Sequence, residues 1–206
     1  MKKLNLSCIL ILAVAGLTLI SCGKDKGENK PEEPAVSTFK DPRDGKVYKT
    51  IRIGNQTWFA ENLAYEGPFS VGSFSYPYSN LDSASKYGMQ YTIDAAENAC
   101  PNGWHLPSDE EWKILEKYLG MSDADLDKVG YDFQRGKDKS IASKLNRGGS
   151  SKFESLNDSG NQGIYWTSTK VGFSHYARSI FEEENAVFRF EAAGGNPTCV
   201  RCLKSN

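Results

Sequence analysis

Two cysteines near the C-terminal end have the spacing of a reactive or metal-binding pair. Cys199-Val-Arg-Cys202 is a CxxC motif, which occurs in redox dithiols and as half of a zinc site. Redox pairs lie at a helix N-terminus, where the dipole lowers the thiol pKa, whereas residues 198–203 have the composition of a terminal β-strand. A structural zinc ion would need two more Cys or His ligands, and the folded part offers only one further cysteine and two histidines. We therefore expect neither redox chemistry nor a metal at this motif.

One of these two cysteines could instead form a structural disulfide with Cys100. Residues three apart in a strand point to opposite faces, so a bond between Cys199 and Cys202 would be strained. A bond from Cys100 to one of them would close a loop of about 100 residues and contribute roughly 4–5 kcal/mol in the loop-entropy treatment. The residues alone leave both pairings open, and the odd number of cysteines leaves one thiol over.

The histidines and carboxylates show no arrangement typical of catalysis. His105 lies between Trp104 and Leu106, which favours a packed or hydrogen-bonded structural role. His175 lies in a Gly-Phe-Ser-His-Tyr segment without a supporting nucleophile arrangement. The acidic residues 182–184 are predicted to be a solvated turn, and no two carboxylates stand out as a glycosidase pair. No cofactor is expected.

One group of oxygen ligands could suit calcium, which prefers carboxylate and carbonyl oxygens. Its members precede Trp166 in the chain and are Glu154, Asn157, Asp158 and Asn161. The Glu-Pro-Asn and Trp-Asn-Asp signatures of calcium-dependent lectins are absent, because Trp166 is followed by Thr-Ser. We interpret the group as a turn-rich loop and predict no metal site.

The N-terminus has the organisation of an export signal with a lipid attachment site. Lys2 and Lys3 precede the apolar run 4–20, which is shorter than the roughly 20 residues of a membrane span. Leu19-Ile20-Ser21-Cys22 resembles the bacterial lipobox, whose cysteine is acylated and becomes the first residue of the mature protein. We predict a signal peptide over 1–21 and lipidation of Cys22. Because two or more buried acyl chains hold a protein stably, the partner of this end of the chain is a membrane surface.

Composition then divides the mature chain into a tether and a domain. Residues 22–37 are rich in Lys, Glu, Gly and Pro and lack aromatic residues, so we predict a flexible tether. The remaining residues 38–206 are of ordinary size for one domain. Without residues 1–21 the chain has 23 basic and 26 acidic side chains, a formal charge of −3. This balance argues against a nucleic-acid partner, which would require a basic surface.

Local patterns place the candidate residues on short elements. Residues 46–59 alternate apolar and polar side chains around Gly54-Asn55, which predicts a hairpin. Residues 63–86 show no period and are predicted to be a long irregular loop, followed by a short helix within 92–99 capped by Thr92. Ser108 and Glu111 form a capping-box pattern that begins a helix ending near Gly120.

Later segments combine two weaker helical stretches with a series of strands. The helical stretches are 122–129 and 140–145, and the predicted strands are 164–168, 176–181, 186–190 and 198–203. Short central helices with antiparallel strands from both ends of the chain predict the α+β class.

Several motifs together resemble one family, the Fibrobacter succinogenes major paralogous domain. They follow the family order and are DGKVYKT (44–50), IGNQTWFAENL (53–63), YGMQYT (87–92), ACPNGWHLPSDEEW (99–112), YWTST (165–169) and VRC (200–202). The resemblance implies a secreted domain with a C-type-lectin-like fold and a Cys100–Cys202 disulfide. Cys199 departs from the family pattern, and residues 150–162 are shorter than usual.

The run 106–112 is also similar to a motif of formylglycine-generating enzymes, which share the lectin-like fold and use a C-terminal cysteine pair that binds copper. Cys199 and Cys202 have the wrong spacing for that pair. We therefore expect a non-catalytic envelope lipoprotein, anchored in the outer membrane, that binds a glycan or a protein. The alternatives are a thiol oxidase of the formylglycine type and a purely structural envelope protein. Gly23 rather than Asp follows Cys22, which disfavours retention in the inner membrane.

Overall fold

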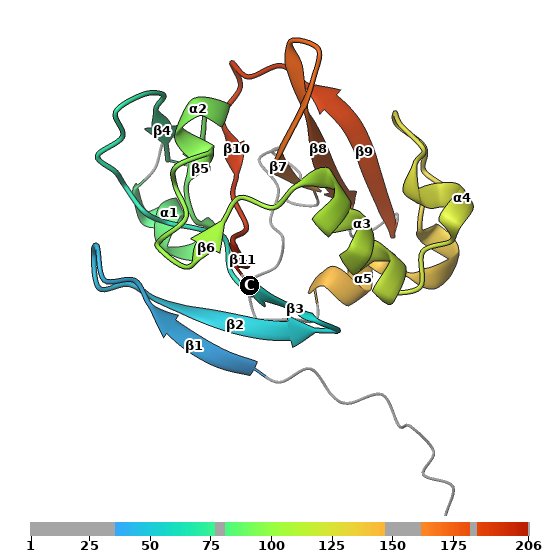
Figure 1. Ribbon diagram of the computed structural model, residues 1–206, viewed down its shortest axis with the longest axis horizontal. Helices are drawn as coiled ribbons and strands as arrows, with labels where there is room; N and C mark the ends of the chain where they lie inside the picture. Colours follow the sequence, from blue (N-terminus) through green and yellow to red (C-terminus); the bar gives the residue numbers. More distant parts are fainter. Residues whose placement is uncertain (1–35, 77–80, 147–161, 182–184, 206) are drawn as a thin grey trace, which may run out of the picture. The chain divides into compact units, whose positions relative to one another are not determined.

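The computed structural model describes residues 36–76, 81–146, 162–181 and 185–205 (Figure 1). These residues belong to one compact unit, Glu33–Asn206. The predicted signal peptide, Cys22 and nearly all of the tether lie outside the described residues. Within the part that the structure describes, no helix is both long and apolar enough to cross a bilayer.

The first sheet joins the beginning of the domain to its last strand. Its order is β1-β2-β3-β11-β6, and the bounds are β1 Val36–Lys40, β2 Val47–Ile53, β3 Gln56–Phe59, β6 Trp104–His105 and β11 Leu203–Lys204. β2 and β3 form the predicted hairpin, in which Ile53 pairs with Gln56 and Gly54 has a φ of +59°. β1 includes Val36 and Ser37, so the last two residues predicted for the tether are already part of a strand.

The second sheet is built from the middle and the end of the chain. Its order is β4-β5-β10-β7-β8-β9, and the bounds are β4 Phe74–Ser75, β5 Gln90–Tyr91, β7 Gln162–Val171, β8 Ser174–Phe181, β9 Ala186–Ala192 and β10 Thr198–Cys199. β7, β8 and β9 are consecutive antiparallel strands, whereas β10 is parallel to β7. The three predicted strands at 164–168, 176–181 and 186–190 are confirmed.

The predicted single strand at 198–203 is wrong, because the chain changes sheets within it. Cys199 pairs with Tyr165 in the second sheet, and Leu203 pairs with Trp58 in the first. Between them, the carbonyl oxygen of Val200 accepts a hydrogen bond from the Leu63 amide at 2.9 Å. The last segment therefore links the two sheets, which its apolar composition alone does not reveal.

The helices are short, and their bounds are α1 Leu81–Tyr87, α2 Ile93–Ala96, α3 Asp109–Tyr118, α4 Asp123–Leu126 and α5 Ile141–Asn146. α3 begins with the predicted capping box, in which Glu111 accepts from the Ser108 amide at 2.8 Å and donates its own amide to Ser108 Oγ at 3.2 Å. Gly120, with a φ of +106°, follows its last turn. Together with the two sheets, these helices confirm the α+β class.

Two details of the middle of the chain differ from expectation. The region 63–86 contains β4 and α1 rather than only irregular loop, because these elements are too short to produce a periodic pattern. Thr92 precedes α2 as predicted, but its hydroxyl does not cap the helix. Instead it accepts from the Ser73 amide at 2.9 Å and donates to the Ser73 carbonyl at 3.2 Å.

The core consists of two clusters, each with side chains from both sheets. One contains Phe59, Trp104, Tyr91 and Trp166. The other packs Trp112 of α3 between Trp58 and Tyr165, with ring centroids 5.0 and 5.9 Å away. Burial of these aromatic rings holds the sheets and α3 together.

Candidate functional site

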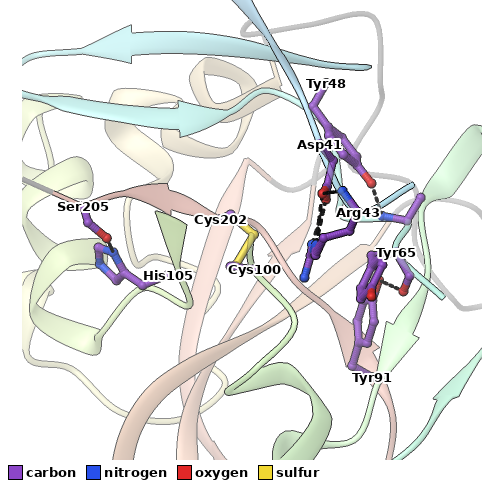
Figure 2. Close-up of a disulfide and its surroundings, with 10 residues drawn as sticks. Asp41, Arg43, Tyr48, Tyr65, Tyr91, Cys100, His105, Cys202 and Ser205 are labelled. Atoms are coloured by element: carbon purple, nitrogen blue, oxygen red, sulfur yellow. Dashed lines mark hydrogen bonds and ion pairs between the residues drawn. A yellow bond between two sulfur atoms is a disulfide. The ribbon is translucent and has the colours of Figure 1, made fainter. Parts of the chain in front are cut away.

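The C-terminal cysteines do not form a reactive pair. Figure 2 shows a disulfide between Cys100 and Cys202, with Cα atoms 5.8 Å apart, which confirms the pairing implied by the family resemblance. Cys199 is a buried free thiol. Burial raises its pKa to about 12, although the nearby charge of Arg201 acts in the opposite direction. A thiol that stays protonated is a poor nucleophile and a poor metal ligand.

Polar residues near the disulfide are paired with one another. Arg43 binds Asp41 at 2.7 Å, and its guanidinium carbon lies 3.7 Å from the centroid of the Tyr65 ring (Figure 2). The Ala64 amide donates to the Tyr48 hydroxyl at 3.1 Å, and the Tyr91 hydroxyl donates to the Tyr65 carbonyl at 2.8 Å. These contacts fix the segments around the disulfide and leave little capacity to bind a ligand.

His105 has the hydrogen-bonded structural role that the sequence predicts, in an arrangement that includes a serine and a glutamate. Its Nδ1 lies 3.0 Å from Ser205 Oγ, and its Nε2 lies 2.9 Å from Glu111 Oε1. In serine hydrolases the opposite ring nitrogen faces the serine. Here the second Glu111 oxygen accepts from Ser108 in the capping box, and the Ser205 amide donates to the Gly103 carbonyl at 2.9 Å. The geometry therefore attaches the C-terminal segment to the start of α3.

Buried ionic groups form a second structural network. Asp109 binds Arg178 at 2.7 Å and Arg189 at 2.8 Å, and Glu116 binds Arg178 and Arg135, each at 2.7 Å. Burial raises the pKa of Asp109, but hydrogen bonds from Arg189 and the charge of Arg178 outweigh it and lower the pKa to about 2. All five side chains are almost fully buried, so the network is inaccessible to a ligand.

Among the described residues, two surface grooves are candidate binding sites, each with a volume of about 540 Å³. The first, which we call the α1 groove, lies between the start of β2, the segment after β3 and α1. Its charged groups are engaged within the protein. Lys46 donates to the Ala64 carbonyl, and Glu61 accepts from the Lys49 amide at 2.9 Å.

The second groove, which we call the hairpin-tip groove, is assembled from four separate segments. It is lined by Lys170 and 172–175 at the β7–β8 turn, 92–94 at the start of α2, 194–195 before β10, and Gly72. In Figure 1 the β7–β8 turn, α2 and the connection from β9 to β10 lie together at the top of the view. Phe173, at the tip of the turn, is fully exposed.

Polar groups in the hairpin-tip groove differ from those of the α1 groove in having few partners. The side chains of Asp94, Lys170 and Ser174 make no hydrogen bond or ion pair with the other described residues. His175 is buried, and its Nε2 lacks a hydrogen-bond partner in the described part of the chain. A Glu97 oxygen lies 3.5 Å from that nitrogen, but without hydrogen-bond geometry. This groove is the candidate functional site.

Sequence reasoning named two residues of this groove, Thr92 as a helix cap and His175 as a histidine without a nucleophile partner, and assigned a ligand to neither. Phe173, Asp94 and Lys170 were missed, because they come from different elements and no local pattern connects them. One available signal was the Gly-Phe pair between two strands, which places an aromatic ring at the tip of a turn.

Several other candidates from the sequence fall on residues that the structure does not describe. The possible calcium ligands over 154–161, the acidic residues 182–184 and Cys22 are outside the described residues. Across 36–76, 81–146, 162–181 and 185–205, no three His, Cys, Asp or Glu side chains come together in a way that could hold a metal ion.

Fold and site together define a disulfide-bonded α+β domain with an open groove at the tip of a hairpin. The chain belongs to the Fibrobacter succinogenes major domain family, whose model matches residues 51–204. No curated protein and no solved structure matches the chain. The family assignment made from the motifs is thereby confirmed, whereas the C-type-lectin-like fold stays a prediction.

Proposed function

We propose that this protein is a lipid-anchored protein of the bacterial envelope that displays a non-catalytic binding domain and binds its ligand in the hairpin-tip groove. One observation carries the binding role: a groove beside the fully exposed Phe173 is lined by polar side chains that have no partner among the described residues. Elsewhere in the described domain the charged groups close to the core are paired with one another. Groups that serve no internal contact are available to an external partner.

Anchoring is proposed from the N-terminal residues. Lys2 and Lys3, the apolar run 4–20 and the lipobox-like 19–22 occur in the order of a lipoprotein signal. The polar segment after Cys22 would hold the domain away from the bilayer, and Gly23 after the cysteine favours the outer membrane. A lectin-like fold, implied by the collinear family motifs, is part of the same proposal.

Replacing the acylated cysteine tests the anchor. Cys22→Ala should abolish labelling by a fatty-acid analogue and move the protein from the membrane to the soluble fraction, because the acyl chains provide the attachment. Cys8→Ala is the matched control, since that residue is removed with the signal peptide, and it should leave labelling and fractionation unchanged. Labelled, membrane-bound Cys22→Ala protein would contradict the proposal.

Binding is tested on the intact lipoprotein in detergent. It would be applied to a glycan array and used to capture proteins from envelope extracts, each with and without calcium. A specific ligand in either format supports the binding role. No ligand in any of these conditions would count against it and would favour the purely structural alternative.

The enzyme alternative depends on the C-terminal cysteines. A thiol oxidase of the formylglycine type needs a reactive pair, whereas Cys202 is bonded to Cys100 and Cys199 is buried with a raised pKa. The bonded Cys202 and the buried Cys199 thiol therefore support a binding role over a thiol oxidase.

A further inference from the structure

We propose that the hairpin-tip groove binds a neutral glycan, with the Phe173 ring as the surface on which a sugar ring stacks. This inference rests on the proposed binding function and specifies the class of ligand. Three features of the groove support it: the ring at its edge, the open space beside Gly195, and the charges on its walls.

Phe173 is exposed in a way that the turn does not require. The β7–β8 turn needs a residue with positive φ, and Gly172 provides it with a φ of +57°. The following position tolerates most residues, yet it holds a large apolar side chain that is fully exposed to solvent. Single exposed apolar residues are common, so exposure alone shows little. Phe173 also lines a groove whose polar side chains lack partners among the described residues, and the apolar face of a sugar packs well on an aromatic ring.

The glycines of the groove fall into two kinds. A Cβ on Gly72 would lie 2.4 Å from the Ala95 amide nitrogen, and one on Gly194 would lie 2.8 Å from Ile93 Cγ2, so packing against α2 explains both. Gly195 is different: a Cβ there would meet no atom within 4 Å, and its φ is not in the left-handed region. Neither close packing nor the backbone therefore requires a glycine at position 195, which lines the groove beside open space. The volume of the groove, about 540 Å³, is within the usual range for small-ligand sites.

The charges on the walls favour a neutral ligand. Asp94 and Lys170 are both exposed and have opposite signs, so an anionic or a cationic ligand would meet one attractive and one repulsive group. Sugar hydroxyls donate and accept hydrogen bonds, and they can use both side chains and the Ser174 hydroxyl at once.

The test uses the intact lipoprotein in detergent and calorimetric titration with hexasaccharides of cellulose, xylan, mannan and chitin, together with an acidic hexasaccharide of polygalacturonate. We expect at least one neutral sugar to bind, and Phe173→Ala to weaken that binding at least tenfold. Phe173→Tyr keeps an aromatic face and should stay within about threefold of the parent. Gly195→Leu should abolish binding by filling the groove without straining the backbone.

Ile114→Ala is the matched control, because Ile114 is also an exposed apolar residue but lies on α3 and does not line the groove. It should bind as the parent does, and unchanged melting temperatures in all four variants would show that they are folded. Binding of the acidic sugar alone, or equal binding by the parent and Phe173→Ala, would overturn the inference. If the lipoprotein captures a specific protein but none of the neutral sugars, this inference fails and the proposed binding function stands; if it binds nothing in any format, both fail.

Discussion

Two cysteines that lie close together in the sequence have different chemical states in this protein. Cys199 and Cys202 are separated by two residues, yet one is a buried thiol and the other is in a disulfide. Cys199 is in β10, inside the second core cluster, where burial disfavours the charged thiolate and raises the thiol pKa to about 12. Cys202 lies beyond the point where the chain leaves that sheet, and there it meets Cys100.

This difference predicts the reactivity of Cys199. In the processed lipoprotein at pH 8, an aromatic disulfide reagent should detect no thiol in the folded state, because the only free thiol among the described residues is buried and protonated. Unfolding in guanidinium should expose one thiol per chain. The same protein with Cys199→Ala should show none in either state. Rapid labelling of the folded parent would contradict the buried, high-pKa thiol.

At the scale of elements, α3 is attached to the second sheet by charges as well as by apolar packing. Its buried face carries Asp109, Trp112 and Glu116, which are spaced at i, i+3 and i+7. The two carboxylates meet arginines from β8 and β9, which supply the opposite charge. Removing one partner of such a network leaves a buried charge without compensation, which is costlier than the net worth of the pair.

Asp109→Asn tests this attachment. It should lower the free energy of unfolding by about 3–5 kcal/mol, because Arg178 and Arg189 would lose their shared carboxylate. Urea denaturation monitored by tryptophan fluorescence gives the value. Glu110→Gln is the matched control on the same helix: its carboxylate is exposed and, among the described residues, pairs only with Lys113, so the loss should be less than about 1 kcal/mol.

The same substitution should change the response to acid. The folded-state pKa of Asp109 is about 2, below the ordinary value of 3.8, so its contribution is fully present above about pH 4 and is lost as the pH falls towards 2. Unfolding free energies measured from pH 6 to pH 2 should therefore decrease less steeply in Asp109→Asn than in the parent. Identical pH profiles of the two proteins would show that Asp109 is not the group responsible for the loss of stability in acid.

At the scale of the whole molecule, one covalent bond joins distant parts of the chain. The disulfide closes a loop with a sequence separation of 102 residues. It bonds Cys202, in the segment where the chain passes from one sheet to the other, to Cys100, in the segment after α2. Loop-entropy arithmetic gives about 4–5 kcal/mol for a loop of this length.

Replacing both cysteines by alanine, Cys100→Ala with Cys202→Ala, should lower the free energy of unfolding by about 4–5 kcal/mol, because the unfolded chain regains its entropy. Adding a reductant should destabilise the parent by a similar amount and leave the double variant unchanged. A loss below about 1 kcal/mol would mean that packing alone holds the two sheets together.

Features that depend on neighbouring residues were predictable. The Gly54-Asn55 turn and the Ser108–Glu111 capping box are set by hydrogen bonds and backbone angles within a few residues, so their positions were correct. β4 and α1 were missed because a strand of two residues and a helix of about two turns leave no measurable period. The groove was missed because its residues lie between positions 72 and 195 and share no local pattern.

The sequence by itself determined the family, from motifs that follow one order along the chain, and the α+β class. It also determined the β2–β3 hairpin and the start of α3, since each of these follows from a pattern within one segment. The family motifs also implied the Cys100–Cys202 disulfide, which the spacing of the cysteines left open. Only the tertiary structure decided where the last segment changes sheets, and that Phe173, Asp94 and Lys170 line one groove. These outcomes depend on how the two sheets and α3 pack together. Such packing brings together residues that are about a hundred positions apart, which short-range preferences cannot specify.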